Sequence, residues 1–489
     1  MLCIAVAPES RRLGKVDLFN AAPQCDLIEF RLDRLGKEPD IKEMMEGINK
    51  PILISCRRKE DGGAWDGSEE ERLVQLRTAI IAGPAYVELE LDIAGDIPRF
   101  GNTKRVVSFT NLKKPLVDLE PMIDEAIAAR ADVVKFVGPT PTLDAAWPLL
   151  ATISKKRNIP VVGMGLGKPG VMFSLLGLKY GAPWIYAALE KGLEAHEGQA
   201  TIAELNDTYR WREIGPQTRF VAVSGFGPAE TAALRVLNAG FAAQKLNIRC
   251  LPLEIGLSDK TTQMLDALHI NVLLADARFC ERALNLAAEI EDSARKAQSA
   301  DLVVKQQDGW HAYNMLWKSV LRVVESHLGA KTAEDRPLDR RNVFVIGAGG
   351  IARSLAFGVQ KRKGLLSVTA ADDNEARQLA QQSGARFIPI ANMYDTLCDI
   401  VLIAEAHAAT ANPQAAPGAV KLNPAFLRPP MWVTDLSNLP GETPLLREAR
   451  ERGCKLIEPA AIFGDHMGAV FKTISGKELP PEVLRHSAE

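Results

Sequence analysis

The chain has 489 residues, of which 47% are hydrophobic and 25% are charged, and its formal net charge at pH 7 is −2. A chain of this length exceeds one ordinary hydrophobic core, so we expect two to four globular domains. The nearly balanced charge gives no electrostatic basis for binding nucleic acid or a membrane surface, which leaves small molecules as the expected partners.

The seven cysteines are scattered and contain no Cys-x-x-Cys pair. This argues against a disulfide framework and against a metal site, and favours a reducing cytoplasm. The first apolar run is only a few residues long and is followed by Glu9, Arg11 and Arg12. We therefore expect a cytoplasmic protein with no signal peptide and no membrane-spanning segment.

Short apolar runs recur through residues 1–212, with helix-like segments such as Glu69–Ala82 and Leu119–Ala129 between them. Strands that alternate with helices at this spacing predict a (β/α)8 barrel of the TIM type. The eight predicted strands are Leu2–Ala7, Asp26–Asp33, Pro51–Arg57, Tyr86–Asp92, Lys104–Asn111, Asp132–Gly138, Pro160–Leu166 and Pro183–Leu189.

Charged side chains stand at the ends of several of these runs, which is where a barrel of this type carries its chemistry. Strand alternation places Glu29 with Arg31, and Glu88 with Glu90, on one face of their strands. Structural ion pairs are the alternative interpretation. The charged residues at the ends of the second, third, fourth and sixth runs are Glu29, Arg31, Asp33, Arg57, Glu88, Glu90 and Lys135.

Lys135 lies in the middle of the β-branched run Asp132–Gly138. Burying an ammonium group without a partner is costly, and the usual response is a lowered pKa. A neutral amine in a closed pocket is a nucleophile toward a ketone, so Lys135 is a candidate Schiff-base lysine. A lysine paired with a carboxylate at the barrel rim is the alternative.

A second α/β domain is predicted over residues 216–335. Its first strand is followed by a Gly/Pro-rich turn and a helix, and further strands and helices alternate after them, as in an open α/β sheet. The predicted strands are Arg219–Ser224, Ile248–Pro252, Ile270–Leu274 and Leu302–Lys305, and the predicted helices are Glu230–Gly240, Ala283–Lys296 and Tyr313–Leu328.

Residues 336–455 carry a dinucleotide-binding pattern: the strand Arg341–Ile346, a G-x-G-x-x-A turn and the helix Arg353–Lys361. The next strand, Leu366–Ala371, ends in two carboxylates, which favour NAD over NADP because they repel a 2′-phosphate. A nucleotide-free domain of this shape is the alternative. The predicted cofactor-binding residues are Gly347, Ala348, Gly349, Gly350, Ile351, Ala352, Asp372 and Asp373. Residues 456–489 are expected to form helices that pack back on the second domain.

Several motifs of the first 210 residues follow one another in a specific order. They are Glu29-Phe-Arg31, Arg57 with Glu60–Gly63, Val87–Glu90, Val106–Phe109, Asp132–Lys135, Met164–Gly170 and Leu189–Lys191 with Gly198-Gln199. Together they resemble the type I 3-dehydroquinate dehydratases of the shikimate pathway. The resemblance implies that Lys135 forms an imine with the substrate ketone. It also implies that Glu29, Arg31, Arg57, Glu90 and Gln199 hold the ring hydroxyls and the carboxylate.

Two positions depart from that family. Thr110 stands where the family has its general acid–base histidine, and Ser174 stands where it has an arginine that clamps the substrate carboxylate. Loss of a general acid–base typically lowers a rate by about 10²–10⁴-fold. His196, in the loop Glu194–Gln199, is a candidate replacement for the base, and a solvated loop histidine is the alternative.

The second and third domains resemble shikimate dehydrogenases through Asn271–Ala277, Tyr313–Leu316, Asp435–Leu446 and Asp465–Phe471. The resemblance implies substrate-binding roles for Thr231, Asn271, Asn314 and His466. Ala277 and Leu316 replace the family's catalytic lysine and aspartate. The neighbouring Arg278 hardly deprotonates and is a poor substitute.

The chain as a whole resembles the fused dehydroquinate dehydratase–shikimate dehydrogenases. It is therefore expected to be an enzyme of aromatic amino-acid biosynthesis that converts 3-dehydroquinate to 3-dehydroshikimate through a Lys135 imine. An NAD(P)-dependent reduction to shikimate is the second activity that the resemblance implies. The alternatives are a catalytically silent relative that binds a shikimate-like ligand or nucleotide to regulate or scaffold a partner, and an enzyme with an altered substrate. A homodimer is compatible with the sequence.

Overall fold

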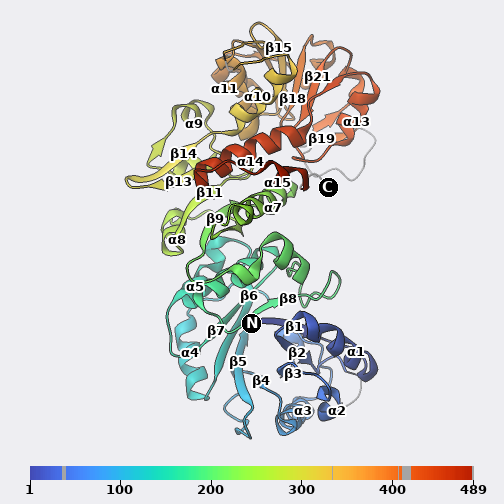
Figure 1. Ribbon diagram of the computed structural model, residues 1–489, viewed down its shortest axis with the longest axis vertical. Helices are drawn as coiled ribbons and strands as arrows, with labels where there is room; N and C mark the ends of the chain where they lie inside the picture. Colours follow the sequence, from blue (N-terminus) through green and yellow to red (C-terminus); the bar gives the residue numbers. More distant parts are fainter. Residues whose placement is uncertain (36–39, 333, 406, 410–419, 487–489) are drawn as a thin grey trace. The chain divides into compact units, whose positions relative to one another are not determined.

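The computed structural model describes residues 1–489 except 36–39, 333, 406, 410–419 and 487–489 (Figure 1). The chain divides into two compact units. The first comprises Met1–Arg219 and Asn247–Met264, and the second comprises Phe220–Leu246 and Leu265–Glu489. The finer division into the predicted segments stays a prediction.

The first unit contains a nearly closed barrel of eight strands in the order β7-β6-β5-β4-β3-β2-β1-β8. Every neighbouring pair is parallel. The predicted barrel and all eight of its strands are confirmed. The strands are β1 (Leu2–Val6), β2 (Leu27–Arg31), β3 (Ile52–Ser55), β4 (Tyr86–Glu90), β5 (Lys104–Thr110), β6 (Val133–Pro139), β7 (Val161–Leu166) and β8 (Ile185–Ala187).

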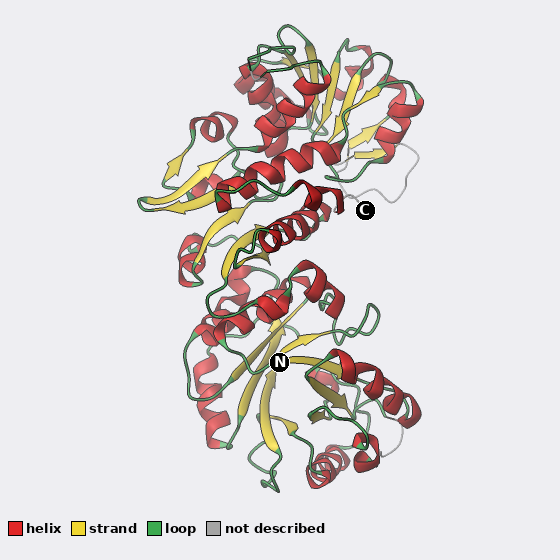
Figure 2. Ribbon diagram, in the orientation of Figure 1, coloured by secondary structure: helices red, strands yellow, loops and turns green. Residues whose placement is uncertain are grey.

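Helices lie outside these strands (Figure 2). They are α1 (Arg11–Ala21), α2 (Ile41–Met45), α3 (Glu69–Ala82), α4 (Leu119–Ala128), α5 (Leu143–Ser154) and α6 (Val171–Tyr180). The local sequence sets the ends of α3: Ser68 and Glu71 form a reciprocal capping box, and Gly83 ends the helix in the left-handed conformation. The first unit also holds β10 (Ile248–Leu253).

An apolar layer fills the barrel interior beneath the polar strand ends. Leu27, Val106, Val133 and Trp184 belong to one buried cluster. Each lies two positions before Glu29, Ser108, Lys135 or Tyr186 on the same strand and therefore on the same face. This apolar layer keeps water from reaching the polar residues through the opposite end of the barrel.

Two sheets make up most of the second unit. In the first, β9 (Arg219–Ser224), β11 (Ile270–Leu274), β13 (Leu302–Gln306), β14 (Gly309–Tyr313) and β12 (Glu289–Ile290) are neighbours in that order. The β11–β13 and β13–β14 pairs are antiparallel, so the sheet is mixed. The accompanying helices are α7 (Pro228–Ala243), α9 (Asp292–Ala297) and α10 (Leu316–His327), and α8 (Thr261–Ala267) begins in the first unit and ends in the second.

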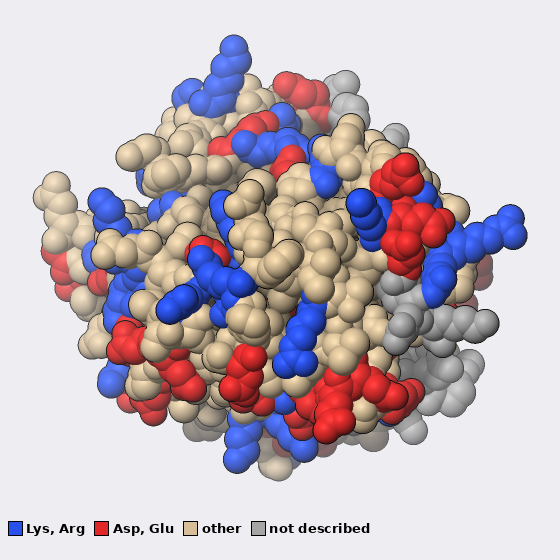
Figure 3. Space-filling view, turned by 90° about the horizontal axis from the view of Figure 1, so that it is seen from below, with Lys and Arg blue, Asp and Glu red and all other residues tan. Residues whose placement is uncertain are grey.

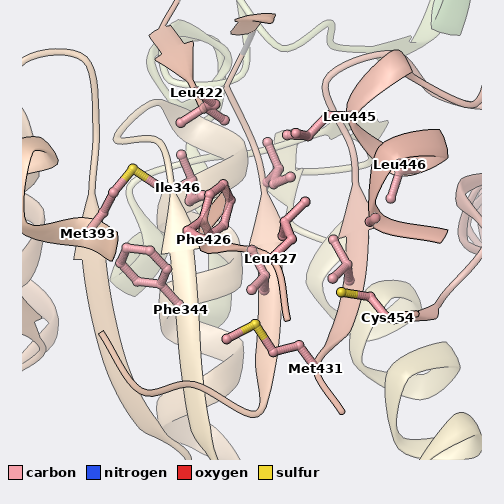
Figure 4. Packing of buried hydrophobic residues seen from close by; sticks show 14 of the residues in the cluster. Phe344, Ile346, Met393, Leu422, Phe426, Leu427, Met431, Leu445, Leu446 and Cys454 are labelled. Atoms are coloured by element: carbon pink, nitrogen blue, oxygen red, sulfur yellow. The ribbon is translucent and has the colours of Figure 1, made fainter. Parts of the chain in front are cut away.

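The other sheet has the order β17-β16-β15-β18-β21-β22 and is parallel throughout. This is the strand order of a dinucleotide-binding fold. Figure 4 shows its core, where Phe344 and Ile346 pack among Leu422, Phe426 and other buried residues. The strands are β15 (Asn342–Ile346), β16 (Leu365–Thr369), β17 (Arg386–Phe387), β18 (Ile400–Ile403), β21 (Trp432–Asp435) and β22 (Lys455–Leu456).

Helices α11 (Gly350–Lys361), α12 (Asp373–Ser383) and α13 (Pro444–Glu451) accompany this sheet, and β19 (His407–Ala409) pairs with β20 (Val420–Leu422). The chain then returns as α14 (Pro459–Ser475) and α15 (Pro481–His486), which contact α7. The Phe241 and Phe471 rings stack with their centroids 5.1 Å apart. The last helices therefore pack on the mixed-sheet part of the second unit.

Two predicted helices of the second unit differ from the structure. Residues 283–296 were expected to be one helix, but the segment contains a 3-10 turn, the short strand β12 and the start of α9. Tyr313 was expected to begin a helix, but it ends β14, and α10 starts at Leu316. Pairing of β12 and β14 at the sheet edge competes here with helical propensity, which is only a weak determinant of structure.

Positive and negative side chains are interspersed on the face shown in Figure 3. This distribution agrees with the small net charge of −2. No described helix is both long enough and apolar enough to span a membrane.

Gly63 offers a test of how the barrel rim is held. A Cβ atom at this position would lie 2.0 Å from the carbonyl oxygen of Arg57. We expect Gly63→Ala to lower the free energy of unfolding by about 1–3 kcal/mol, because the main chain after β3 must shift. Urea unfolding followed by circular dichroism measures this change. Gly95→Ala is the matched control, since its Cβ would meet no atom within 4 Å, and equal stability of the two variants would contradict the prediction.

Candidate active site

Lys135, on β6, is fully buried at the polar end of the barrel interior. Its Nζ donates to Glu88 Oε2 at 2.9 Å, to Glu29 Oε2 at 3.3 Å and to the Tyr186 hydroxyl at 2.8 Å. The ammonium thus has partners from β2, β4 and β8. Because these groups supply both charge and hydrogen bonds, they offset the penalty for burying the cation.

Arg57 completes the group. Its Nη2 lies 3.1 Å from Glu29 Oε1 and 3.0 Å from Glu88 Oε1, and Ser55 donates to Glu29 Oε1 at 2.9 Å. We call Glu29, Arg57, Glu88, Lys135 and Tyr186 the Lys135 cluster. It contains two cations and two carboxylates, so its formal charges cancel.

The pKa values follow from this arrangement. Burial opposes ionisation of Glu29, but the charges of Arg57 and Lys135 outweigh it and hold the pKa of the carboxyl well below its usual range. Burial likewise opposes the charge on Arg57, and Glu29 and Glu88 reverse the effect and raise its pKa. Burial and the charge of Glu29 raise the pKa of Tyr186 well above its usual value, so the phenol keeps its proton at neutral pH.

Arg31 and Glu90, two predicted substrate-binding residues, are engaged with other groups. Arg31 Nη2 bonds Asp33 at 2.7 Å and the carbonyl oxygen of Gly62 at 2.9 Å. Glu90 accepts from Arg72 Nη1 at 2.9 Å, yet burial outweighs this cation and raises the pKa of Glu90 to about 6. Arg31 and Glu90 are therefore bound to groups outside the Lys135 cluster, whereas Glu29 and Arg57 belong to it.

His196 and Gln199 line a small pocket with Ser174 and Tyr186. Burial lowers the pKa of His196, which favours the neutral ring that a base requires. Gln199 uses its Oε1 to accept from Ala195 N at 2.8 Å, and its buried Nε2 has no hydrogen-bond partner among the described residues. The structure therefore places both residues beside the Tyr186 edge of the cluster.

The two departures from the dehydratase family can be located. Thr110 lies on β5 two residues beyond Ser108, which is paired with Lys135 in the sheet register. Its side chain is therefore one layer, about 7 Å, further along the same inward face. The Ser174 hydroxyl donates to the carbonyl oxygen of Tyr186 at 3.2 Å. Neither side chain carries a charge, so neither offers the cation or the base that the family has there.

Sequence reasoning left two members of the cluster out of the predicted site. Glu88 lies on the same strand as Glu90, and of the two it is Glu88 that contacts Lys135. Tyr186 was hidden in an apolar run that predicts only a strand. Alternation gives the face of each residue, but it does not show which layer of the barrel meets the lysine.

In the second unit, the glycine-rich turn has the form that a dinucleotide requires. Gly347 has a φ of 131°, and a Cβ there would lie 3.0 Å from the Cβ of Glu405. A Cβ on Gly349 would meet no atom within 4 Å, which leaves room at the start of α11 for a phosphate. Gly350 is covered instead, since its Cβ would lie 2.1 Å from Cys280 Sγ. Ala348 and Ala352 are buried within the turn and the helix.

The two acidic residues after β16 are both bound to main-chain amides. Asp372 accepts from Asn374 N at 2.7 Å as the cap of α12, and Asp373 accepts from Ile390 N at 3.3 Å. Glu405 adds a third carboxylate at this end of the sheet. Burial raises the pKa of Glu405. The turn has the form that a dinucleotide requires.

The four predicted substrate residues of this unit divide into two groups. Thr231 and Asn271 are exposed, on α7 and β11. Asn314 is buried and donates to Ser299 O at 2.9 Å and Ser354 Oγ at 2.7 Å. His466 is also buried, with Nε2 4.0 Å from Asp301 Oδ2.

Asp301 accepts from Met315 N, at 2.9 Å, and from Leu316 N, so it caps α10. Burial raises the pKa of Asp301 and lowers that of His466. Among the described residues, no hydrogen bond or ion pair joins Thr231 or Asn271 to Asp301 or His466. The part of the chain that the structure describes also contains no group of three or more His, Cys, Asp or Glu side chains arranged to hold a metal ion.

Comparison with known proteins gives three findings. Residues 2–216 match the family model described as Type I 3-dehydroquinase. The chain is 25% identical over 480 residues to the bifunctional 3-dehydroquinate dehydratase/shikimate dehydrogenase of Arabidopsis thaliana, covering 94% of this chain and 79% of that protein. It is 28% identical over 209 residues to the 3-dehydroquinate dehydratase of Dehalococcoides mccartyi, covering 41% of this chain and 91% of that protein.

Solved structures were compared as well. The dehydroquinate dehydratase and shikimate dehydrogenase from S. pombe covers 100% of this chain and is itself covered to 98%, with 17% identity and a TM-score of 0.42. A shikimate dehydrogenase in complex with NADP+ covers 56% of this chain and is covered to 95%, with 21% identity and a TM-score of 0.48. The sequence comparisons lead to one conclusion: residues 2–216 match the type I 3-dehydroquinases, and the chain is similar over nearly its whole length to a bifunctional 3-dehydroquinate dehydratase/shikimate dehydrogenase.

Proposed function

We propose that this chain is a shikimate-pathway enzyme whose first unit dehydrates 3-dehydroquinate to 3-dehydroshikimate. One observation carries the proposal: the fully buried Lys135 is held by two carboxylates and a phenol inside a barrel that matches this family. A lysine amine that attacks the ring ketone gives a protonated imine, which withdraws electrons from the neighbouring carbon. Loss of a proton there and of a hydroxyl group further along the ring releases water and leaves a conjugated imine on the lysine. Hydrolysis of this imine by a second water molecule restores the carbonyl as a conjugated enone and frees the lysine amine.

Glu29 and Glu88 contact the lysine directly, and Arg57 binds both carboxylates, so the three residues keep the lysine in place. Gln199 is proposed to donate its unpartnered Nε2 to the substrate. Arg31 and Glu90 are proposed to act at the rim, through ring hydroxyls. The cations of the Lys135 cluster are matched by its carboxylates. We therefore expect the substrate carboxylate to bind less tightly than in a site with an additional arginine.

The pocket beside Tyr186 has a volume of only about 20 Å³, room for about one or two water molecules. A six-membered ring needs more space, so the segment His196–Gln199 is proposed to move when substrate enters. A Cβ on Gly198 would lie 2.5 Å from Lys168 N, which shows how closely this segment covers the turn after β7.

The test is to supply purified protein with 3-dehydroquinate, without nicotinamide, and to follow the absorbance of the enone. We expect the wild-type protein to form enone and Lys135→Ala to form none. In the wild-type protein, borohydride should reduce the imine to a stable adduct on Lys135, because the ketone forms an imine with this amine. Lys179→Ala, which removes a lysine from α6 outside the barrel interior, is the control. An unchanged rate in Lys135→Ala, or absence of both enone and adduct in the wild type, contradicts the proposal and favours a ligand-binding role without catalysis.

His196 is proposed to take the substrate proton in place of the missing histidine at position 110. We expect His196→Ala to lower the enone rate by about 10²–10⁴-fold, the usual contribution of a general base. Adding Thr110→His to that variant should restore part of the rate, because position 110 lies on the inward face above Lys135. A His196→Ala rate equal to that of the wild type would remove this role.

We further propose that the second unit binds a nicotinamide dinucleotide at the turn Gly347–Ala352. The open space at Gly349 and the start of α11 support a pyrophosphate there, and Asp372 supports a ribose hydroxyl. When bound, such a cofactor supplies hydride chemistry. The roles of Thr231, Asn271, Asn314 and His466 in holding a shikimate-like carboxylate stay predictions, and Ala277 and Leu316 favour binding over reduction.

The cofactor preference is testable by titration calorimetry. We expect NAD to bind at least tenfold more tightly than NADP, because the carboxylates of Asp372, Asp373 and Glu405 disfavour a 2′-phosphate. Asp372→Asn should narrow the difference between the two affinities, and Glu375→Gln, in the first turn of α12, serves as the control. Tighter binding of NADP to the wild-type protein would contradict this preference.

A cytoplasmic location is also proposed. All seven cysteines are free thiols, as expected of a protein in a reducing compartment. The homodimer stays a prediction.

A further inference from the structure

Tyr186 occupies a special position in the Lys135 cluster. Its hydroxyl accepts from Lys135 Nζ at 2.8 Å, which is closer than either carboxylate contact of the lysine, and it also hydrogen-bonds Glu29. The ammonium lies over the phenol ring, 4.4 Å from the centroid. Tyr186 is buried, so both hydrogen bonds are made away from bulk water.

The three groups form a chain that can carry a proton. Nζ of Lys135 donates to the Tyr186 oxygen, and the phenol O–H donates to the Glu29 carboxylate. The direct contact from Nζ to Glu29 is longer, at 3.3 Å, than the link through the phenol. A hydroxyl between a donor and an acceptor passes a proton on without itself becoming charged, because it receives one as it gives the other away.

We propose that Tyr186 relays protons between Lys135 and Glu29 as the imine forms; this inference rests on the proposed Schiff-base function. An ammonium is not a nucleophile, so a proton must leave Nζ before it attacks a ketone. In the first step the ammonium proton moves to the Tyr186 oxygen, and the phenol proton moves to Glu29. The products are a neutral amine, a neutral phenol and a neutral carboxylic acid.

The amine then attacks the carbonyl carbon. A C–N bond forms, the carbonyl π-electron pair becomes the oxygen lone pair, and a proton shifts from nitrogen to that oxygen to give a carbinolamine. The relay runs backwards in the last step: Glu29 returns its proton to Tyr186, and the phenol proton passes to the carbinolamine oxygen. The C–O bond breaks, water leaves, and the nitrogen lone pair forms the protonated imine. No external acid or base is consumed.

The charges of the cluster make this exchange reversible. Arg57 and Lys135 are the two cations that lower the pKa of Glu29 most. When Lys135 loses its proton, one of these two charges disappears, so Glu29 becomes a better acceptor at the moment when a proton arrives. Glu88 contacts Nζ at 2.9 Å and is the competing acceptor, but it offers no path back to the departing oxygen through a neutral hydroxyl.

The experiment measures the rate constant of imine formation by rapid mixing with 3-dehydroquinate and borohydride quench, with the adduct on Lys135 quantified by mass spectrometry. We expect Tyr186→Phe to lower this rate constant by about 10²–10⁴-fold, as for loss of an acid–base group. The rate constant of the Tyr186→Phe variant should also rise steeply with pH, because hydroxide must then take the proton from Lys135 Nζ. Tyr86→Phe is the control: it removes the hydroxyl group of a tyrosine whose ring packs on Trp184 in the apolar layer. This variant should leave the rate constant and its pH profile unchanged.

A second measurement uses the wild-type protein alone and does not depend on how the variant folds. Two protons move together in the relay, so the rate constant of imine formation should fall non-linearly with the deuterium fraction of the solvent. A linear dependence, or a Tyr186→Phe rate within twofold of the wild type, overturns the relay while adduct formation upholds the Schiff-base function. If the wild type forms no adduct, the Schiff-base function itself fails and the relay fails with it.

Discussion

The first unit depends on the balance of charge around one buried ammonium. Lys135 has no contact with solvent, and its neighbours supply two carboxylates, a phenol and, through those carboxylates, a guanidinium. Removal of any one charged member leaves another uncompensated in a medium where such a charge is costly. The apolar layer beneath the cluster maintains this condition by keeping water away. The strand register, the burial and the chemistry are therefore linked.

Much of the first unit could be predicted from its sequence because parallel strands and barrel ends impose strong patterns. The eight apolar runs give the strands, and Lys135 is conspicuous as a lysine within one of them. The contacts of the site were harder to predict. Glu88 and Glu90 share a face and a strand, and only the three-dimensional stagger of the barrel decides that Glu88 meets Lys135 while Glu90 meets Arg72. Tyr186 gave no signal, because a tyrosine in an apolar run is ordinary core.

The second unit shows the same limit in another form. The strand–turn–helix pattern around Gly347–Ala352 is local, and its glycines respond to close approaches that the structure contains. The mixed sheet is not local: β12 and β14 acquire their strand character by pairing with each other, and a helical reading of Ala283–Lys296 is overridden. Asn314 and His466 are likewise fixed by burial against distant elements, which no spacing in the sequence reveals.

The strand order of the barrel starts at β7 and ends at β8. Ser174 lies on α6, the helix that follows β7, and Tyr186 lies on β8. The Ser174 hydroxyl donates to the main-chain carbonyl of Tyr186, and this hydrogen bond links the helix after β7 to the strand that carries the phenol. Elsewhere in the barrel, neighbouring strands are held by ladders of main-chain hydrogen bonds. This seam is thus the part of the wall that can widen at the smallest energetic penalty. A ligand too large for the pocket would therefore enter most readily by parting β7 from β8, while the ladders of β2 to β6 stay intact.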